Sequence, residues 1–146
     1  MSSRHLARGI ALQILAQWDF NTSILGKSLD LNEVIKNNLE YFAPKNFDEK
    51  EFVEELVLGV YKNLDKIDTY IKEFAPHWPL DKITPVDRNI LRLSIWEMMF
   101  SKNVPPKVAI NEAVEIAKIF GNISSGKFVN GVLGTIYNKY KKDEER

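Results

Sequence analysis

Apolar residues recur along most of the chain at intervals of three and four positions, which is the spacing of amphipathic helices. No segment shows the strict alternation of apolar and polar residues that marks a half-buried strand. Polar, glycine-containing or proline-containing segments interrupt the pattern. They divide it into seven predicted helices, at about residues 3–20, 31–42, 48–62, 66–74, 85–101, 105–121 and 125–140. The sequence therefore predicts an all-α fold of seven helices.

The fifth helix has the clearest start in the chain. Thr84 can serve as its N-cap, Pro85 occupies the first helical position, and Asp87 stands three residues after the cap, where an acid completes a capping box. Apolar residues then cover nearly all directions of the helical wheel, as they do in a helix that is buried on most sides. We therefore predict a mostly buried central helix over about residues 85–101.

Weaker signals place the ends of other helices. Asp48 and Glu51 have the spacing of a capping box at the start of the third helix. Gly121 suits the C′ position after the sixth helix, and either Ser124 or Ser125 can cap the seventh.

Glycine and tryptophan positions add expectations about packing. Gly131 and Gly134 lie three residues apart in the last helix, and we expect them to allow the close approach of a neighbouring backbone. Tryptophan side chains are mostly core or semi-buried in folded proteins, and this is the expectation for Trp18, Trp78 and Trp96.

Length and composition indicate one soluble domain. The chain has 146 residues, within the ~100 to 200 residues usual for a domain. We expect a single helical domain over residues 1–142 and a charged, frayed tail over 143–146. No run approaches the ~18 apolar residues of a membrane span, and the N-terminus lacks a secretory apolar segment, so a cytoplasmic location is expected. The absence of cysteine excludes disulfides, thiolate metal sites and cysteine nucleophiles.

Charge is balanced overall but unevenly distributed. The net charge is zero, which argues against a protein that coats nucleic acid through bulk positive charge. Residues 28–60 carry a net charge of −5, whereas residues 118–142 hold five lysines and no acid. Two interpretations remain open: solvated helix faces that cancel, or a dipolar molecule with an anion-facing end near the C-terminus.

The inventory of catalytic residues is small. The only histidines, His5 and His77, are 72 residues apart and have no metal-ligand spacing near them. Residues 121–128 nearly match a phosphate-binding loop, but Phe128 stands where the magnesium-binding hydroxyl is required, and a predicted helix precedes the loop instead of a strand. These residues still predict a helix N-terminus with serine hydroxyls and Lys127 beside it. Such a helix start can bind one backbone phosphate of a larger ligand.

Several segments, taken together and in order, resemble one known family. They are the RHLAR, ALQIL and WD stretches of the first predicted helix, VLGV at 57–60, VDRNILRL at 86–93, VAINEAVEIAK at 108–118 and FVNGVL at 128–133. This series is similar to the NusB family of bacterial transcription antitermination factors. The resemblance extends from Arg4 to about Tyr137, and INEAVEIAK and KFVNGVL are its most specific parts.

The resemblance implies a compact seven-helix domain that is not an enzyme and needs no cofactor or metal. It implies an RNA-binding adaptor that, with the ribosomal protein NusE, recognises boxA-type single-stranded RNA in nascent ribosomal RNA transcripts. Such an adaptor joins the RNA polymerase antitermination complex on ribosomal RNA operons.

The resemblance also assigns RNA-binding positions in the first helix. The matching residues are Arg4 and Arg8, with His5 where another arginine is common. Ala16 replaces a tyrosine that is common on the exposed side of this helix, so one base-stacking contact is absent. Independently, Arg4 and Arg8 are four residues apart and share one edge of the helix, so both can face one run of phosphates.

The turn before the last helix belongs to the same family surface. Its counterparts here are Ser124, Lys127 and Phe128, with Ser124 in place of an acid found in some members. Asp87 matches an acidic position at the NusE-binding surface. From the sequence alone, the Asp87 carboxylate has two interpretations: it completes the Thr84 capping box, or it pairs with a basic side chain of NusE.

Two other functions remain open. One is the NusB-like N-terminal domain of a ribosomal RNA methyltransferase, although no residues remain after Arg146 for a methyl-donor-binding domain. The other is a protein-only scaffold that has lost RNA contact, which the arginine-poor N-terminal arm favours. The sequence leaves the oligomeric state open, including a homodimer that covers this arm.

Overall fold

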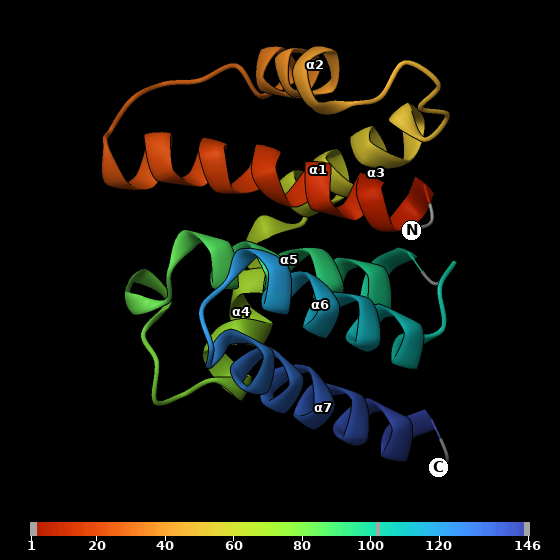
Figure 1. Cartoon of the computed structure of the whole chain (residues 1–146). Coiled ribbons are helices and arrows are strands. Elements are labelled where there is room, and N and C mark those ends of the chain that lie inside the picture. The colour runs from red at the N-terminus through yellow and green to blue at the C-terminus, as the bar shows by residue number, and fades with distance from the viewer. Residues whose placement is uncertain (1–2, 102, 145–146) are drawn as a thin grey trace. The chain divides into compact units, whose positions relative to one another are not determined.

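The computed structural model describes residues 3–101 and 103–144, and the side chains of 142–144 are left undescribed (Figure 1). Every regular element in the described residues is helical, as the sequence predicts. Two compact units make up the chain, Met1–Lys62 and Asn63–Arg146. The single domain over residues 1–142 stays a prediction. Within the described residues, no helix combines the length and the apolar character needed to cross a membrane.

The first unit is built from three helices. They are α1 (Ser3–Asp19), α2 (Leu31–Phe42) and α3 (Lys50–Lys62), and the π-helical turn η1 (Phe20–Ile24) extends α1. Helix α1 packs against both α2 and α3. The side chains of α1 that face the core are Ala7, Ile10, Ala11, Leu12, Ile14 and Leu15, and Trp18 is half-buried, as the sequence predicts for a tryptophan.

The starts of α2 and α3 differ in their agreement with the sequence. Asp30 caps α2, because its Oδ1 accepts a hydrogen bond from Asn32 N at 3.0 Å. The capping box predicted at Asp48 is wrong. Helix α3 begins at Lys50, and the carbonyl of Glu49 accepts the hydrogen bond from Val53 N at 3.1 Å, which places the N-cap one residue later.

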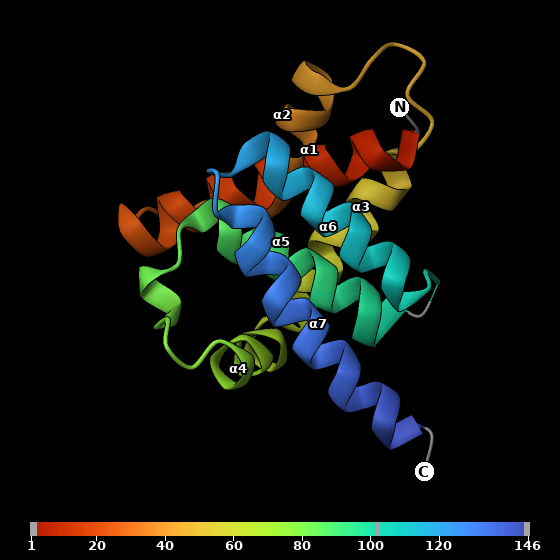
Figure 2. The same cartoon turned by 60° about the horizontal axis from the view of Figure 1, so that its bottom comes forward.

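The second unit contains the other four α-helices of the described residues. They are α4 (Leu64–Phe74), α5 (Pro85–Trp96), α6 (Pro106–Phe120) and α7 (Ser125–Glu144). The 3-10 turn η2 (Leu80–Lys82) precedes α5, and the π-helical turn η3 (Glu97–Ser101) follows it. Helix α6 packs along α7, and α5 contacts α4, α6 and α7 (Figure 2). Residues 143–144 are helical, and 145–146 of the expected tail lie outside the described residues.

The prediction of a mostly buried central helix is confirmed. Every residue of α5 from Asp87 to Trp96 is buried, and η3 continues the helical path to Ser101. Its predicted N-cap and first residue are also confirmed: Pro85 is the first helical residue, and Thr84 Oγ1 accepts a hydrogen bond from Asp87 N at 3.2 Å. The other half of the predicted capping box is wrong, because the Asp87 carboxylate does not bond back to Thr84 and its Oδ1 has no hydrogen-bond partner.

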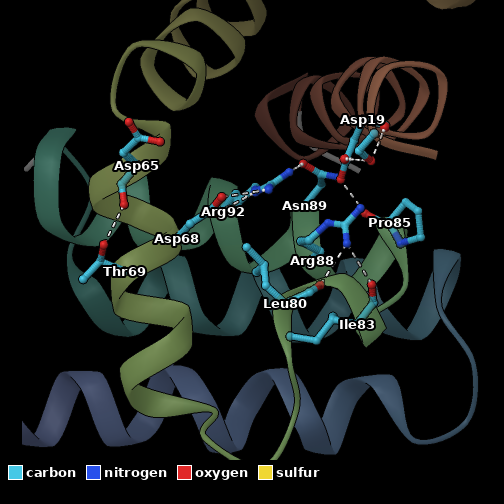
Figure 3. Close-up of polar contacts among 11 residues, drawn as sticks. Asp19, Asp65, Asp68, Thr69, Leu80, Ile83, Pro85, Arg88, Asn89 and Arg92 are labelled. Atoms are coloured by element: carbon cyan, nitrogen blue, oxygen red, sulfur yellow. Dashed lines mark hydrogen bonds and ion pairs between the residues drawn. The ribbon is translucent and has the colours of Figure 1, made fainter. Parts of the chain in front are cut away.

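Two buried arginines of α5 hold its surroundings in place (Figure 3). Arg92 forms a bidentate ion pair with Asp68 of α4, with Nε 2.8 Å from Oδ1 and Nη2 3.0 Å from Oδ2. Arg88 Nη1 donates to the carbonyl of Leu80 at 2.9 Å and lies 3.3 Å from that of Ile83. These contacts fasten the connection between α4 and α5 to the buried helix.

The close packing predicted at Gly131 and Gly134 is wrong. A Cβ atom added at either position would meet no other atom within 4 Å. Gly121 has the opposite environment, because an added Cβ would collide with the Ser125 side chain and lie 2.8 Å from the carbonyl of Ala117. A methyl group therefore fits at the first two positions and not at the third.

Gly131→Ala is expected to raise the free energy of unfolding by about 0.5 to 1 kcal/mol, because alanine favours helix over the unfolded chain and meets no obstacle here. Urea melts monitored by circular dichroism measure the change. Gly121→Ala is the matched control, and its stability is expected to fall because of the collision with Ser125. A loss of stability in Gly131→Ala would mean that α7 has a close neighbour at this position.

Candidate functional site

A pocket of about 470 Å³ in the second unit gathers four of the residues that the sequence singled out. It lies among the connection from α4 to α5, the first turn of α5 and the turn between α6 and α7. Its lining consists of Trp78, Lys82, Ile83, Thr84, Asp87, Asn122, Ser124, Lys127 and Phe128. The candidate RNA-binding residues Ser124, Lys127 and Phe128 therefore share one pocket with the candidate partner-binding residue Asp87.

Two aromatic side chains form one part of this lining. The rings of Trp78 and Phe128 meet edge to face, with centroids 6.1 Å apart. Trp78 is 56% exposed, so the prediction that it is core or semi-buried is wrong. Pro76 and Pro79 flank it closely and interrupt the helical pattern, which leaves the ring on a surface segment instead of a packed helix face. Trp96 is buried, as predicted.

The turn before α7 is fixed by a small network of hydrogen bonds. Asn122 Oδ1 accepts from Ser124 N at 3.0 Å and from Ser124 Oγ at 2.8 Å. Ser125 is buried, and its Oγ accepts from Asn122 N at 2.9 Å. The carbonyl of Ser124 accepts from Phe128 N, so Ser124 is the N-cap of α7. This network fixes the backbone from which Ser124 and Lys127 reach the pocket.

Gly121 contributes to the same turn in a way that differs from the prediction. As the residue after α6 it has φ −93° and ψ −167°, an extended conformation and not the left-handed one of a typical C′ glycine. Its lack of a side chain matters because the Ser125 side chain approaches its Cα closely.

The charges that line the pocket are two exposed lysines and one buried acid. Lys82 and Lys127 are exposed. Asp87 is 9% exposed, and its Oδ1 is buried without a hydrogen-bond partner. Thr84 caps the backbone of Asp87, yet this carboxylate oxygen is left unsatisfied. A buried acceptor without a hydrogen-bond partner costs about 1 to 3 kcal/mol.

The candidate residues of α1 belong to the first unit and have unequal exposure. The Arg4 side chain is 51% exposed, its guanidinium lies 4.2 Å from the ring centroid of Phe52, and its Nε is 3.6 Å from Glu49 Oε2. The Arg8 guanidinium lies 5.3 Å from the same ring centroid, but Arg8 is only 6% exposed. His5 is partly buried and has interactions of its own. Of the three, Arg4 presents the most surface to a ligand.

Sequence reasoning missed several residues of these sites. Trp78, Lys82 and Asn122 line the pocket, and Phe52 lies beneath the arginines of α1. The proline-flanked aromatic residue just before the best-capped helix was a usable signal for Trp78. Phe52 gave no such signal, because its position in the helical pattern marks an ordinary core residue and its role depends on how α3 packs against α1.

The described residues form an all-helical fold with a pocket that combines aromatic rings, lysines and a buried acid. The model of the NusB family matches residues 5–138, and the chain belongs to this family. The transcription antitermination protein NusB of Bacillus pumilus is 43% identical over 142 residues, which cover 95% of this chain and 98% of that protein.

Solved structures agree with this assignment. The chain is similar to one in the crystal structure of the antitermination factors NusB and NusE in complex with dsRNA, with a TM-score of 0.81 and 32% identity over 96% of this chain and 99% of that one. It is also similar to T. maritima NusB, with a TM-score of 0.78 and 34% identity over 94% and 92% of the two chains. The predicted family and helical fold are confirmed.

Proposed function

We propose that this protein is a non-enzymatic, RNA-binding adaptor in transcription antitermination. It acts with the ribosomal protein NusE on boxA-type RNA in nascent ribosomal RNA transcripts, as part of the RNA polymerase antitermination complex. The similarity over nearly the full chain to a NusB chain solved with NusE and dsRNA supports this proposal. The observation that carries it is the pocket that Asp87, Ser124, Lys127 and Phe128 line together.

Each side of the site has a distinct role in this proposal. Lys127 and the serine-rich start of α7 bind RNA phosphate, because lysine and free helix N-terminal amides both favour anions. Phe128 offers an apolar ring face for a base. Arg4 binds phosphate from α1, and His5 and Arg8 contribute less because less of their surface is accessible.

Asp87 is the proposed contact for the protein partner. A basic side chain from NusE would pair with the small exposed part of the Asp87 carboxylate and add favourable electrostatic steering. Asp87 lines the same pocket as the proposed RNA-binding turn, which supports neighbouring sites for NusE and RNA in this proposal. Each ligand is then expected to change the affinity for the other by the same factor.

Titration of labelled boxA RNA tests the proposal directly. The RNA is titrated with this protein alone, with NusE alone and with both, and a scrambled RNA of equal length is the control. The expected result is preferential binding of boxA RNA that tightens when NusE is present. NusE binding without RNA binding in any mixture would instead indicate a protein-only scaffold.

Lys127→Gln is expected to weaken RNA binding about fivefold at 0.1 M salt. Loss of one phosphate contact to single-stranded RNA lowers the slope of log affinity against log salt by about 0.7, and the change should be similar for all RNA sequences. Lys107→Gln is the matched control, since Lys107 is an exposed lysine of α6 that does not line the pocket. Equal affinities and salt slopes for the two variants would remove Lys127 from the RNA surface.

A further inference from the structure

Arg4 is held by two side chains of the first unit, one from Phe52 in α3 and one from Glu49, which directly precedes α3. The ring of Phe52 lies beneath the guanidinium at 4.2 Å, and the carboxylate of Glu49 approaches Nε at 3.6 Å. Phe52 is 7% exposed, and the Glu49 side chain is 25% exposed. A buried ring therefore fixes the position of the guanidinium, while a partly exposed acid neutralises it from one side.

The contact with Glu49 is weaker than the contact that a phosphate can make. At 3.6 Å, Arg4 Nε and Glu49 Oε2 form an ion pair but are too far apart for a hydrogen bond. Guanidinium groups bind phosphate through short, often paired hydrogen bonds. About half of the Arg4 side chain is exposed, so a phosphate can approach without moving the guanidinium off the ring. A carboxylate and a phosphate present the same type of acceptor to Arg4.

We propose that Phe52 positions Arg4 for RNA and that Glu49 competes with RNA phosphate for it. This proposal rests on the RNA-binding function proposed above. In the free protein Glu49 neutralises Arg4, so an RNA that contacts the protein only at Arg4 gains little affinity from it. An RNA that is also held elsewhere on the protein can displace Glu49 and gain the arginine contact. Glu49 and Phe52 are thus positioning residues that set how much Arg4 adds to affinity.

Glu49→Gln is expected to raise the affinity for boxA RNA about twofold to fivefold, the range that corresponds to an exposed ion pair. Glu55→Gln is the matched control, because Glu55 is an exposed acid of α3, the helix that Glu49 precedes, and its loss changes the net charge equally. Fluorescence titrations with NusE present measure both affinities. Equal affinities for the two variants would show that Glu49 acts only through bulk charge and would overturn the proposal.

A double-mutant cycle tests whether Glu49 acts through Arg4. In the Arg4→Gln background, Glu49→Gln is expected to change RNA affinity no more than Glu55→Gln does, since the competing contact is gone. A full gain from Glu49→Gln in that background would overturn the proposal. If the unmodified protein with NusE bound no RNA at all, the proposed function itself would be wrong, and this outcome is distinct from the previous two.

Phe52→Leu tests the role of the ring. Leucine retains apolar burial but cannot support a cation over its face, so RNA affinity is expected to fall about twofold to fivefold. A thermal melt checks that the variant is folded, and the Arg4 cycle decides the question if it is not. A folded Phe52→Leu protein with unchanged RNA affinity would remove Phe52 from the proposal.

Discussion

Ile95→Ala is expected to lower the free energy of unfolding by about 2 to 5 kcal/mol. Ile95 lies in α5 and is fully buried, as is Leu91 one turn earlier. Truncation to alanine deletes buried carbon atoms, so their favourable burial is lost. It also leaves a cavity that the close-packed helices fill only in part. Urea melts followed by circular dichroism measure the loss.

Ile123→Ala is the matched control for this experiment. Ile123 is fully exposed in the turn before α7, so the same chemical change there is expected to alter stability by less than about 0.5 kcal/mol. A loss below about 1 kcal/mol for Ile95→Ala would contradict the central position of α5.

Asp87→Lys is expected to weaken NusE binding by about 2 kcal/mol or more. The substitution replaces a buried acid by a cation in a pocket that already contains Lys82 and Lys127, so a basic partner meets repulsion instead of an acceptor. RNA binding by the protein without NusE should not weaken, because the added cation lies in the same pocket as the proposed RNA-binding turn. Isothermal calorimetry with NusE measures the affinity, and a thermal melt of the free variant measures its stability.

Asp87→Asn separates the interface role from the capping role. The amide has nearly the same size, and the Thr84 hydroxyl can still accept from the backbone N–H of residue 87, so stability is expected to change by less than about 1 kcal/mol. NusE affinity should still fall, because the charge is lost. Asp65→Asn is the control, since Asp65 does not line the pocket. A folded Asp87→Asn variant with normal NusE affinity would remove Asp87 from the proposed NusE interface.

The sequence predicted helices best where a local signal determined the backbone. Thr84 and Pro85 act within one turn of chain, and the structure places α5 as they predict. Asp48 and Glu49 are both acids near the start of α3, and their spacing could not decide which one becomes the N-cap. Gly131 shows a different difficulty, because a helical glycine is compatible with close packing or with open space and only the neighbouring elements decide.

The candidate site was predicted only in part, for a related reason. The family resemblance supplied Asp87, Ser124, Lys127 and Phe128, and the structure adds that all four line one pocket. Trp78 and Phe52 were missed or misjudged because an aromatic side chain serves equally well in a core and in a binding surface. Which role it takes depends on contacts between segments far apart in the chain.

The ion pair between Arg92 and Asp68 has a consequence for how this protein can evolve. Both side chains are at most 14% exposed, and Arg92 also donates to Asn89 Oδ1 at 3.1 Å. Loss of either charged partner leaves the other buried and uncompensated, at a cost of about 3 to 5 kcal/mol, whereas apolar residues of similar volume at both positions are often tolerated. Single substitutions at these positions are therefore expected to destabilise the protein strongly, while a paired apolar substitution is not. We therefore expect the residues at positions 68 and 92 to change together, or not at all, among related sequences.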